Sequence, residues 1–192
     1  GDRGWMGLMG PPTPPLPVRP ERLVAVETAG WRQLDDASRA AFEAVVGALR
    51  GAGVSVLRRG DHPFIEAFEP AIADASAAGS AITAWENRWS QRALVDANPD
   101  GVSARAKAVL AAAEAMSVAD YQARLAEREA AQLRHAALAP MADAVIGLAS
   151  PGPAPVWGGD APGRPPVARP TGDFVFNAPS SMLFAPVVTV PL

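Results

Sequence analysis

The sequence predicts an α/β fold in which helices flank a mixed sheet, and three observations indicate this class. Short apolar runs rich in β-branched residues recur along the chain, as expected for buried strands. Stretches with helical periodicity separate these runs. The first two runs and the helix between them have about the minimum length of a parallel crossover, which is right-handed as a rule. Alternation of strands and helices is typical of the α/β class.

The first strand–helix–strand unit begins near the N-terminus. Residues 22–28 (RLVAVET) and 54–57 (VSVL) are its predicted strands. Asp35 or Asp36 is expected to cap the helix between them, because a short side-chain oxygen can accept free backbone N–H groups. One face of this helix is an apolar stripe at i, i+3, i+4 and i+7. The stripe consists of Phe42, Val45, Val46 and Leu49.

This helix is expected to end at Gly51 and Gly53, since glycine accepts the left-handed conformation at low cost. Residues 63–139 then predict a series of helices. Pro63 suits a first helical turn, and Gly79 is expected to divide the run in two. The following boundary is a strong turn sequence at 98–101 (NPDG), after which Ser103 or a neighbour starts a new helix.

The last of these helices is predicted to run from Ser117 to Leu138. Ser117 and Asp120 have the spacing of a capping box, with Asp in the acid position. The side chains expected to face inward in this helix and the one before it are Val109, Leu110, Tyr121, Leu125, Leu133 and Leu138. Those expected to face solvent are Arg124, Glu127, Arg128 and Glu129.

The C-terminal part predicts a third strand at 144–148 and a Pro/Gly-rich loop at 150–170. A short helix at 177–183 and a last apolar strand at 187–190 are expected to follow. Such a strand is typical of a sheet interior. We therefore expect the β segments to pair with neighbours that this polypeptide does not contain, as in an interior-to-C-terminal piece of a longer protein.

Composition limits the class of protein further. Residues 1–20 are Pro/Gly-rich and predict a loop, and residues 21–192 predict one partial α/β domain. Hydrophobic residues make up 49% and charged residues 19%, which indicates a globular chain. The net charge of −3 argues against nucleic-acid binding. The sequence has no cysteine and no apolar run long enough for a membrane span, so we expect a cytoplasmic protein without metal or cofactor.

Four stretches resemble the amidase-signature family of hydrolases, in the family's order. They are residues 7–31, 102–129 and 140–155, and above all 171–192 (TGDFVFNAPSSMLFAPVVTVPL). The family's late segment runs roughly T-G-x-x-x-F-N-x-P-x-S-x-x-G-x-P. The resemblance implies part of an amidase-signature α/β/α fold, and an enzyme that splits a carboxylic amide into an acid and ammonia or an amine.

The chain departs from the family pattern in two ways. The family uses a Lys–Ser–Ser triad, one serine of which lies in a Gly/Ser-rich loop, and no such loop occurs here. Lys107, the only lysine, lies in an Ala-rich helix. We therefore predict that this chain carries no catalytic residue and is inactive alone. The second departure is Phe184, which stands where the family has glycine.

The predicted substrate-binding residues are Asp173, Phe174, Asn177 and Trp157. Asp173 follows a Gly turn and precedes a Phe, and transamidating relatives place an acidic residue near here against the substrate amine. Asn177 could instead satisfy backbone groups at a helix start. Trp157 belongs to the 150–170 loop, for which a pocket wall and a free surface loop are both open.

Other polar residues favour structural roles. Ser180 and Ser181 have no His or Lys nearby in sequence to act as a base, so backbone bonding is the favoured interpretation. His62 and His135, the two histidines, are predicted to be structural, with no metal site. Glu86 lies between Trp85 and Trp89, in a helix expected to pack both rings.

Two other functions remain open beside the amide hydrolase. One is a non-catalytic module whose helices between Val102 and Leu138 bind a partner. The other is a subunit of a transamidase. We expect a small-molecule amide as the ligand, neither nucleic acid nor membrane as a partner, and a homodimer as the candidate assembly.

Overall fold

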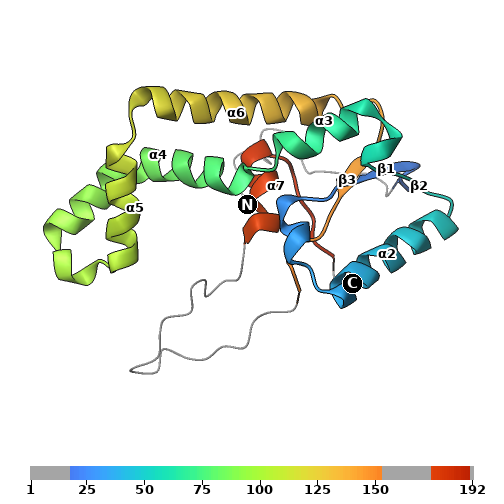
Figure 1. Ribbon diagram of the computed structural model, residues 1–192, viewed down its shortest axis with the longest axis horizontal. Helices are drawn as coiled ribbons and strands as arrows, with labels where there is room; N and C mark the ends of the chain where they lie inside the picture. The colour runs from blue at the N-terminus through green and yellow to red at the C-terminus, as the bar shows by residue number, and fades with distance from the viewer. Residues whose placement is uncertain (1–17, 153–173, 191–192) are drawn as a thin grey trace, which may run out of the picture.

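A computed structural model describes residues 18–152 and 174–190 of the chain (Figure 1). Most of the predicted 1–20 loop therefore lies outside the described residues, and the domain boundary at residue 21 stays a prediction. The strands and helices occur in the following order. They are β1 (Arg22–Ala25), η1 (Ala29–Gln33), α2 (Asp36–Gly51), β2 (Ser55–Leu57), η2 (Arg59–Asp61), α3 (Pro63–Ala71), α4 (Ala75–Ala97), η3 (Pro99–Gly101), α5 (Ala104–Ala115), α6 (Val118–Ala136), β3 (Ala144–Ile146), η4 (Phe174–Phe176) and α7 (Ala178–Leu183).

The described strands form one sheet in the order β2–β1–β3. Both pairs are parallel, with Leu23 opposite Val56 and Val24 opposite Val145. The α/β class and the parallel crossover are confirmed. The expected mixed sheet is not: within the described residues every strand pair is parallel, because each strand returns to the same end of the sheet through helices.

Both faces of the sheet are covered, which explains why β1 is apolar from Leu23 onward. Val24 and Val26 pack with Ile65 and Phe68 of α3, and this core continues into α6 and α7. The alternate residue Ala25 faces a second core with Trp31, Phe42, Val46 and Phe176. The period of two along a strand thus sends successive side chains into two different cores.

The predicted helix starts are confirmed by their hydrogen bonds. Asp35 caps α2, where its Oδ1 accepts the backbone N–H of Ser38 at 2.6 Å. Ser117 and Asp120 form both bonds of a capping box at the start of α6. Gly53 follows α2 with φ of 82°, in the left-handed region that glycine accepts.

The helix break expected at Gly79 is wrong. Gly79 lies inside α4, and the chain breaks instead between α3 and α4, around residues 72–74. Glycine inside a helix costs about 1 kcal/mol relative to alanine. Burial of Ala75, Ala78 and Ile82 on the same helix outweighs that cost.

Two predicted core residues face solvent. Leu133 is 66% exposed and Val109 is 41% exposed. The buried residues of α6 and the turn after it are Ala131 and Leu138, seven residues apart and therefore on one helix face, whereas Leu133 lies about 200° around from Ala131. Among the other predicted core residues, Leu110 is buried, while Tyr121 and Leu125 are half-buried.

The strand predicted at 187–190 is absent. Val187, Val188 and Val190 are exposed, and the segment is extended without strand pairing in the described part of the chain. An apolar, β-branched sequence favours extended backbone, but only a hydrogen-bonded neighbour makes it a strand.

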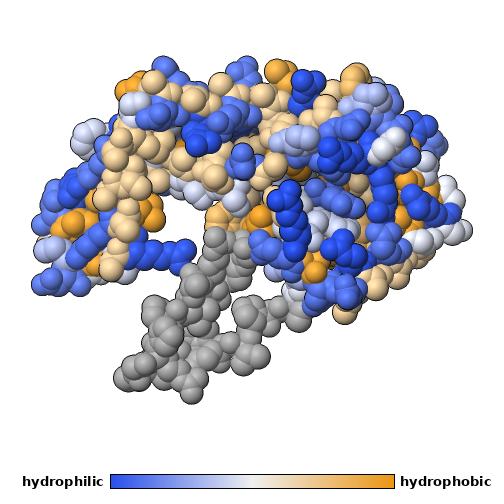
Figure 2. Space-filling view, in the orientation of Figure 1, coloured by the Kyte–Doolittle hydropathy of each residue, from blue (hydrophilic) through white to orange (hydrophobic). Residues whose placement is uncertain are grey.

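The helices after α3 leave the sheet. The second half of α4 extends away from it, α5 lies across the far end, and α6 returns beside α4 (Figure 1). We call residues 83–130 the helical arm and residues 18–82, 131–152 and 174–184 the sheet body. Figure 2 shows hydrophobic side chains exposed at the far end of the arm, and Leu94 there is 64% exposed. No described helix is long and apolar enough to cross a membrane.

Candidate functional site

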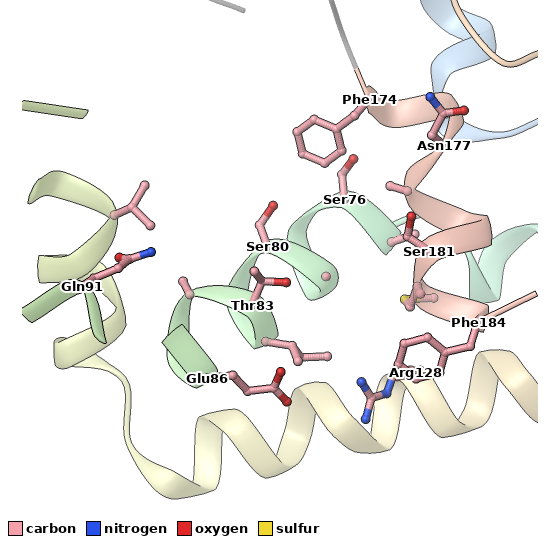
Figure 3. Close-up of a pocket in the computed structure, with 17 residues that line it drawn as sticks. Ser76, Ser80, Thr83, Glu86, Gln91, Arg128, Phe174, Asn177, Ser181 and Phe184 are labelled. Atoms are coloured by element: carbon pink, nitrogen blue, oxygen red, sulfur yellow. The ribbon is translucent and has the colours of Figure 1, made fainter. Parts of the chain in front are cut away.

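A cavity of about 470 Å³ lies where the arm joins the body (Figure 3). One wall is a face of α4, and the opposite wall is α7 with the preceding η4. Arg128 of α6 and Val109 of α5 complete the lining. Most of the surface is apolar, with Ile82 and Met182 among the lining side chains. Ligand sites usually combine such a surface with a few polar groups.

The α7 wall contains both described residues that the sequence predicts to bind substrate. Phe174 and Asn177 line the same cavity, together with Ser181. The Asn177 side chain does not cap α7. Its carboxamide is therefore not used by the helix, contrary to the capping role that the sequence left open. Asp173 and Trp157 lie outside the described residues.

The α7 wall is held in place by η4. Phe176 packs into the core beside Trp31, and Gly30 lies so close to its ring that a Cβ on Gly30 would overlap it. Glycine is therefore needed at this position for close approach. This contact fixes the end of η4 against the body, and so fixes where Phe174 and Asn177 enter the cavity.

Ser180 and Ser181 have different environments. The Ser180 hydroxyl donates to the backbone carbonyl of Asn177 at 2.9 Å, the role that the sequence favours. Ser181 instead lines the cavity and faces α4 (Figure 3). Adjacent helical residues point about 100° apart, which gives these two consecutive serines different neighbours.

The α4 wall presents a row of hydroxyl groups that the sequence analysis missed. Ser76, Ser80 and Thr83 line the cavity. Their spacing of four and three residues puts them on one helix face, and this spacing was the available sequence signal. The buried Ser76 Oγ and Gln91 Oε1 have no hydrogen-bond partner among the described residues. Buried polar atoms normally have a hydrogen-bond partner, so both are exceptions to that rule.

The end of the cavity near α6 is charged. The Glu86 carboxylate accepts a hydrogen bond from the Tyr121 hydroxyl at 2.8 Å, and this bond raises the pKa of Tyr121. Arg128, which the sequence predicts to face solvent, lines the cavity, and its guanidinium lies 5.0 Å from the centre of the Phe184 ring. The helix around Glu86 was expected to pack both of its tryptophan rings. Only Trp85 does so, by stacking on Tyr121, whereas Trp89 is 72% exposed.

Phe184 has an unusual backbone. It ends α7 in the left-handed conformation, with φ of 54°, and no other described non-glycine residue has a positive φ. Left-handed backbone costs a residue with a Cβ about 1 kcal/mol. Glycine is the usual residue at this place after a helix.

The cavity can bind polar groups, but the described residues do not supply a nucleophile with its base. Ser181 would need a Lys or His within hydrogen-bond reach, and neither type is among the lining residues. His62 accepts the Phe64 N–H at the start of α3, and His135 packs against the Phe68 ring. Both histidines thus have structural contacts, as expected. The described residues contain no cluster of three metal-ligating side chains.

Comparison with known proteins gives one fold match. No family model and no curated protein matches this chain. A solved structure, a crystal structure of an amidase, superposes on 88% of this chain with a TM-score of 0.66 at 20% sequence identity. The matched region is 38% of that amidase, so the chain spans well under half of its length. The chain is therefore similar in fold to part of an amidase. The more specific assignment to the amidase-signature family stays a prediction.

Proposed function

We propose that this chain is the C-terminal portion of an amidase-signature amide hydrolase and forms one side of its amide-binding site. The fold match over most of the chain is the observation that carries this proposal. The position of the cavity supports it, because Phe174 and Asn177 belong to the segment with the strongest sequence resemblance to the family.

The polar groups of the cavity suit a carboxamide. An amide offers a carbonyl acceptor and N–H donors. The Asn177 carboxamide can pair with it in a complementary way, and the hydroxyls of Ser76 and Ser181 can donate to its carbonyl. The apolar surface around Ile82 and Met182 would hold the acyl or amine substituent.

In this proposal the chain binds and orients the amide but does not attack it. The attacking serine and the lysine that activates it would come from the family's Lys–Ser–Ser region, which this sequence lacks. Nucleophilic attack on an amide also needs donors for the developing oxyanion, and these too would come from that region.

A ligand comparison tests the binding role. Benzamide and acetophenone have nearly the same shape, but acetophenone has a methyl group in place of the amide nitrogen. We expect the purified chain to bind benzamide about two- to tenfold more tightly, the worth of one net hydrogen bond. Backbone NMR shifts should map the contact to Asn177 and Ser181. Equal affinities, or shifts elsewhere, would contradict the proposal.

Consecutive serines provide a matched control. Ser181→Ala should remove the preference for benzamide, whereas Ser180→Ala should keep it, because the Ser180 hydroxyl bonds to the helix. We also expect no release of benzoate and ammonia from benzamide by the chain alone. Turnover that either alanine variant abolishes would show that the chain contains its own nucleophile.

A further inference from the structure

Resting on the proposed function, we propose that the α6 end of the cavity selects amide substrates that also carry a free ammonium and a free carboxylate. The site consists of Glu86 for the ammonium, Arg128 for the carboxylate, and Phe184 beneath the guanidinium. This zwitterion site lies in the same cavity as Asn177 and Ser181, which would hold the amide.

The first step of the argument is that the two charges are positioned but not paired. Tyr121 holds the Glu86 carboxylate at 2.8 Å, and the Tyr121 ring is itself stacked on Trp85 with centroids 5.4 Å apart. Arg128 lies over the Phe184 ring and has no carboxylate within ion-pair distance among the described residues. Figure 3 shows the charged ends of Glu86 and Arg128 pointing toward one another across the cavity.

The second step concerns the kind of ligand that gains from this pair. An anion attracted to Arg128 also meets the negative Glu86, and a cation attracted to Glu86 also meets the positive Arg128. The two contributions largely cancel for a ligand of one sign. A ligand with both charges a few ångströms apart, as in the head group of an α-amino acid, is attracted by both and repelled by neither.

The third step is the conformation of Phe184. Its ring is 72% exposed, so core packing does not explain a phenylalanine here, and its backbone is strained where glycine would be relaxed. Strain of this kind often accompanies a binding role. A guanidinium on an aromatic ring is held in one place with its N–H edge free, which suits recognition of a carboxylate.

Three probes that share a phenylethyl group test the proposal on the full chain at pH 7. Phenylalanine is a zwitterion, 3-phenylpropionate has only the carboxylate, and 2-phenylethylamine has only the ammonium. We expect calorimetric titration to show phenylalanine binding about tenfold more tightly than either ion. Affinities within twofold of one another, or tightest binding of either single ion, would overturn the proposal.

Charge-removing variants assign the two halves of the site. Glu86→Gln should reduce phenylalanine affinity to about that of 3-phenylpropionate, and Arg128→Gln should reduce it to about that of 2-phenylethylamine. Glu129→Gln and Arg124→Gln remove the same charges from α6 outside the cavity and should keep the preference. An equally large loss of the preference for phenylalanine in these control variants would mean that the ligand responds only to the overall charge of α6.

Phe184→Gly separates a binding role from a structural one. It relieves the left-handed strain, so the melting temperature should stay the same or rise, while the preference for phenylalanine falls. A lower melting temperature with an unchanged preference would overturn the role of Phe184. The two proposals can fail separately. If benzamide still binds through Ser181 but charged groups on the ligand do not raise its affinity, the amide-binding proposal stands and only the zwitterion site is disproved.

Discussion

In the sheet body, large apolar side chains fill two cores, with Val24, Ile65 and Phe68 almost fully buried. In the helical arm, Leu110 and Ala113 are the core residues, while Trp89 and Leu94 are exposed. The arm relies more on local interactions. Seven of the twelve residues of α5 are alanine, which favours helix without any partner, and an Arg92–Glu114 ion pair joins α4 to α5.

This difference means that the two ends of the cavity are held in different ways. The α7 wall is attached to the body through Ala178 and Met182, which belong to the core around Phe68. The charged end of the cavity depends on the arm, where Tyr121 and Trp85 hold Glu86. Regions with few buried apolar contacts open at lower free energy than a core does.

The largest effect expected is from a substitution in the body. Phe68→Ala should lower the free energy of unfolding by about 3–5 kcal/mol, because it removes a buried ring and leaves a cavity. Chemical denaturation measures the change. Leu133→Ala is the matched control, since this leucine is 66% exposed and should change stability by no more than about 0.5 kcal/mol. Similar losses in both variants would mean that the body does not depend on this core.

A smaller and more local effect is expected in the arm. Leu110→Ala should cost about 2 kcal/mol, at the low end for a buried leucine, because helices with small alanine side chains can move together and close part of the cavity. Hydrogen exchange should show lost protection in residues 104–115 and unchanged protection in β1. Equal loss in β1 would break the comparison, because it would show that arm and body unfold as one cooperative unit.

The smallest effect is a pH dependence at the edge of the sheet. The Asp143 carboxylate accepts the backbone N–H groups of Arg22 at 3.0 Å and Glu21 at 2.8 Å, and these bonds hold the pKa of Asp143 below its usual value of 3.8. Its contribution to stability is therefore present above pH 3.8 and is lost as the pH falls through the lower pKa of the folded state.

Asp143→Asn checks this sign. The difference in unfolding free energy between the two proteins should be largest near neutral pH and should disappear in strong acid. Asp100→Asn, which removes a carboxylate from the arm, leaves the bonds to Glu21 and Arg22 intact and should retain the acid-dependent loss. A difference that grows toward acid would mean that the bonds to β1 do not depend on the charge of Asp143.

The parts of the fold that follow local rules were predictable. Asp35 and Ser117 cap their helices because a short oxygen next to free N–H groups acts within one turn. The three short parallel strands follow from apolar runs buried on both faces. Gly79 and Leu133 were predicted wrongly, because burial elsewhere on the same helix decided between two locally acceptable outcomes.

The candidate site was only partly predictable. Phe174 and Asn177 were found through resemblance to a family segment, and they share a cavity. Arg128 and the hydroxyl row of α4 were missed, because a helix face rich in polar residues looks solvated until another element packs against it. The zwitterion site draws Glu86 and Arg128 from two different helices, 42 residues apart in sequence, and nothing local couples them.

The sequence by itself determined the helix starts and the alternation of strands and helices, because each depends on interactions within a few residues. The tertiary structure decided which faces became core, which serine faced the cavity and which charges met there. It also left Val187 to Val190 unpaired, since a strand exists only where another part of a sheet supplies its hydrogen bonds.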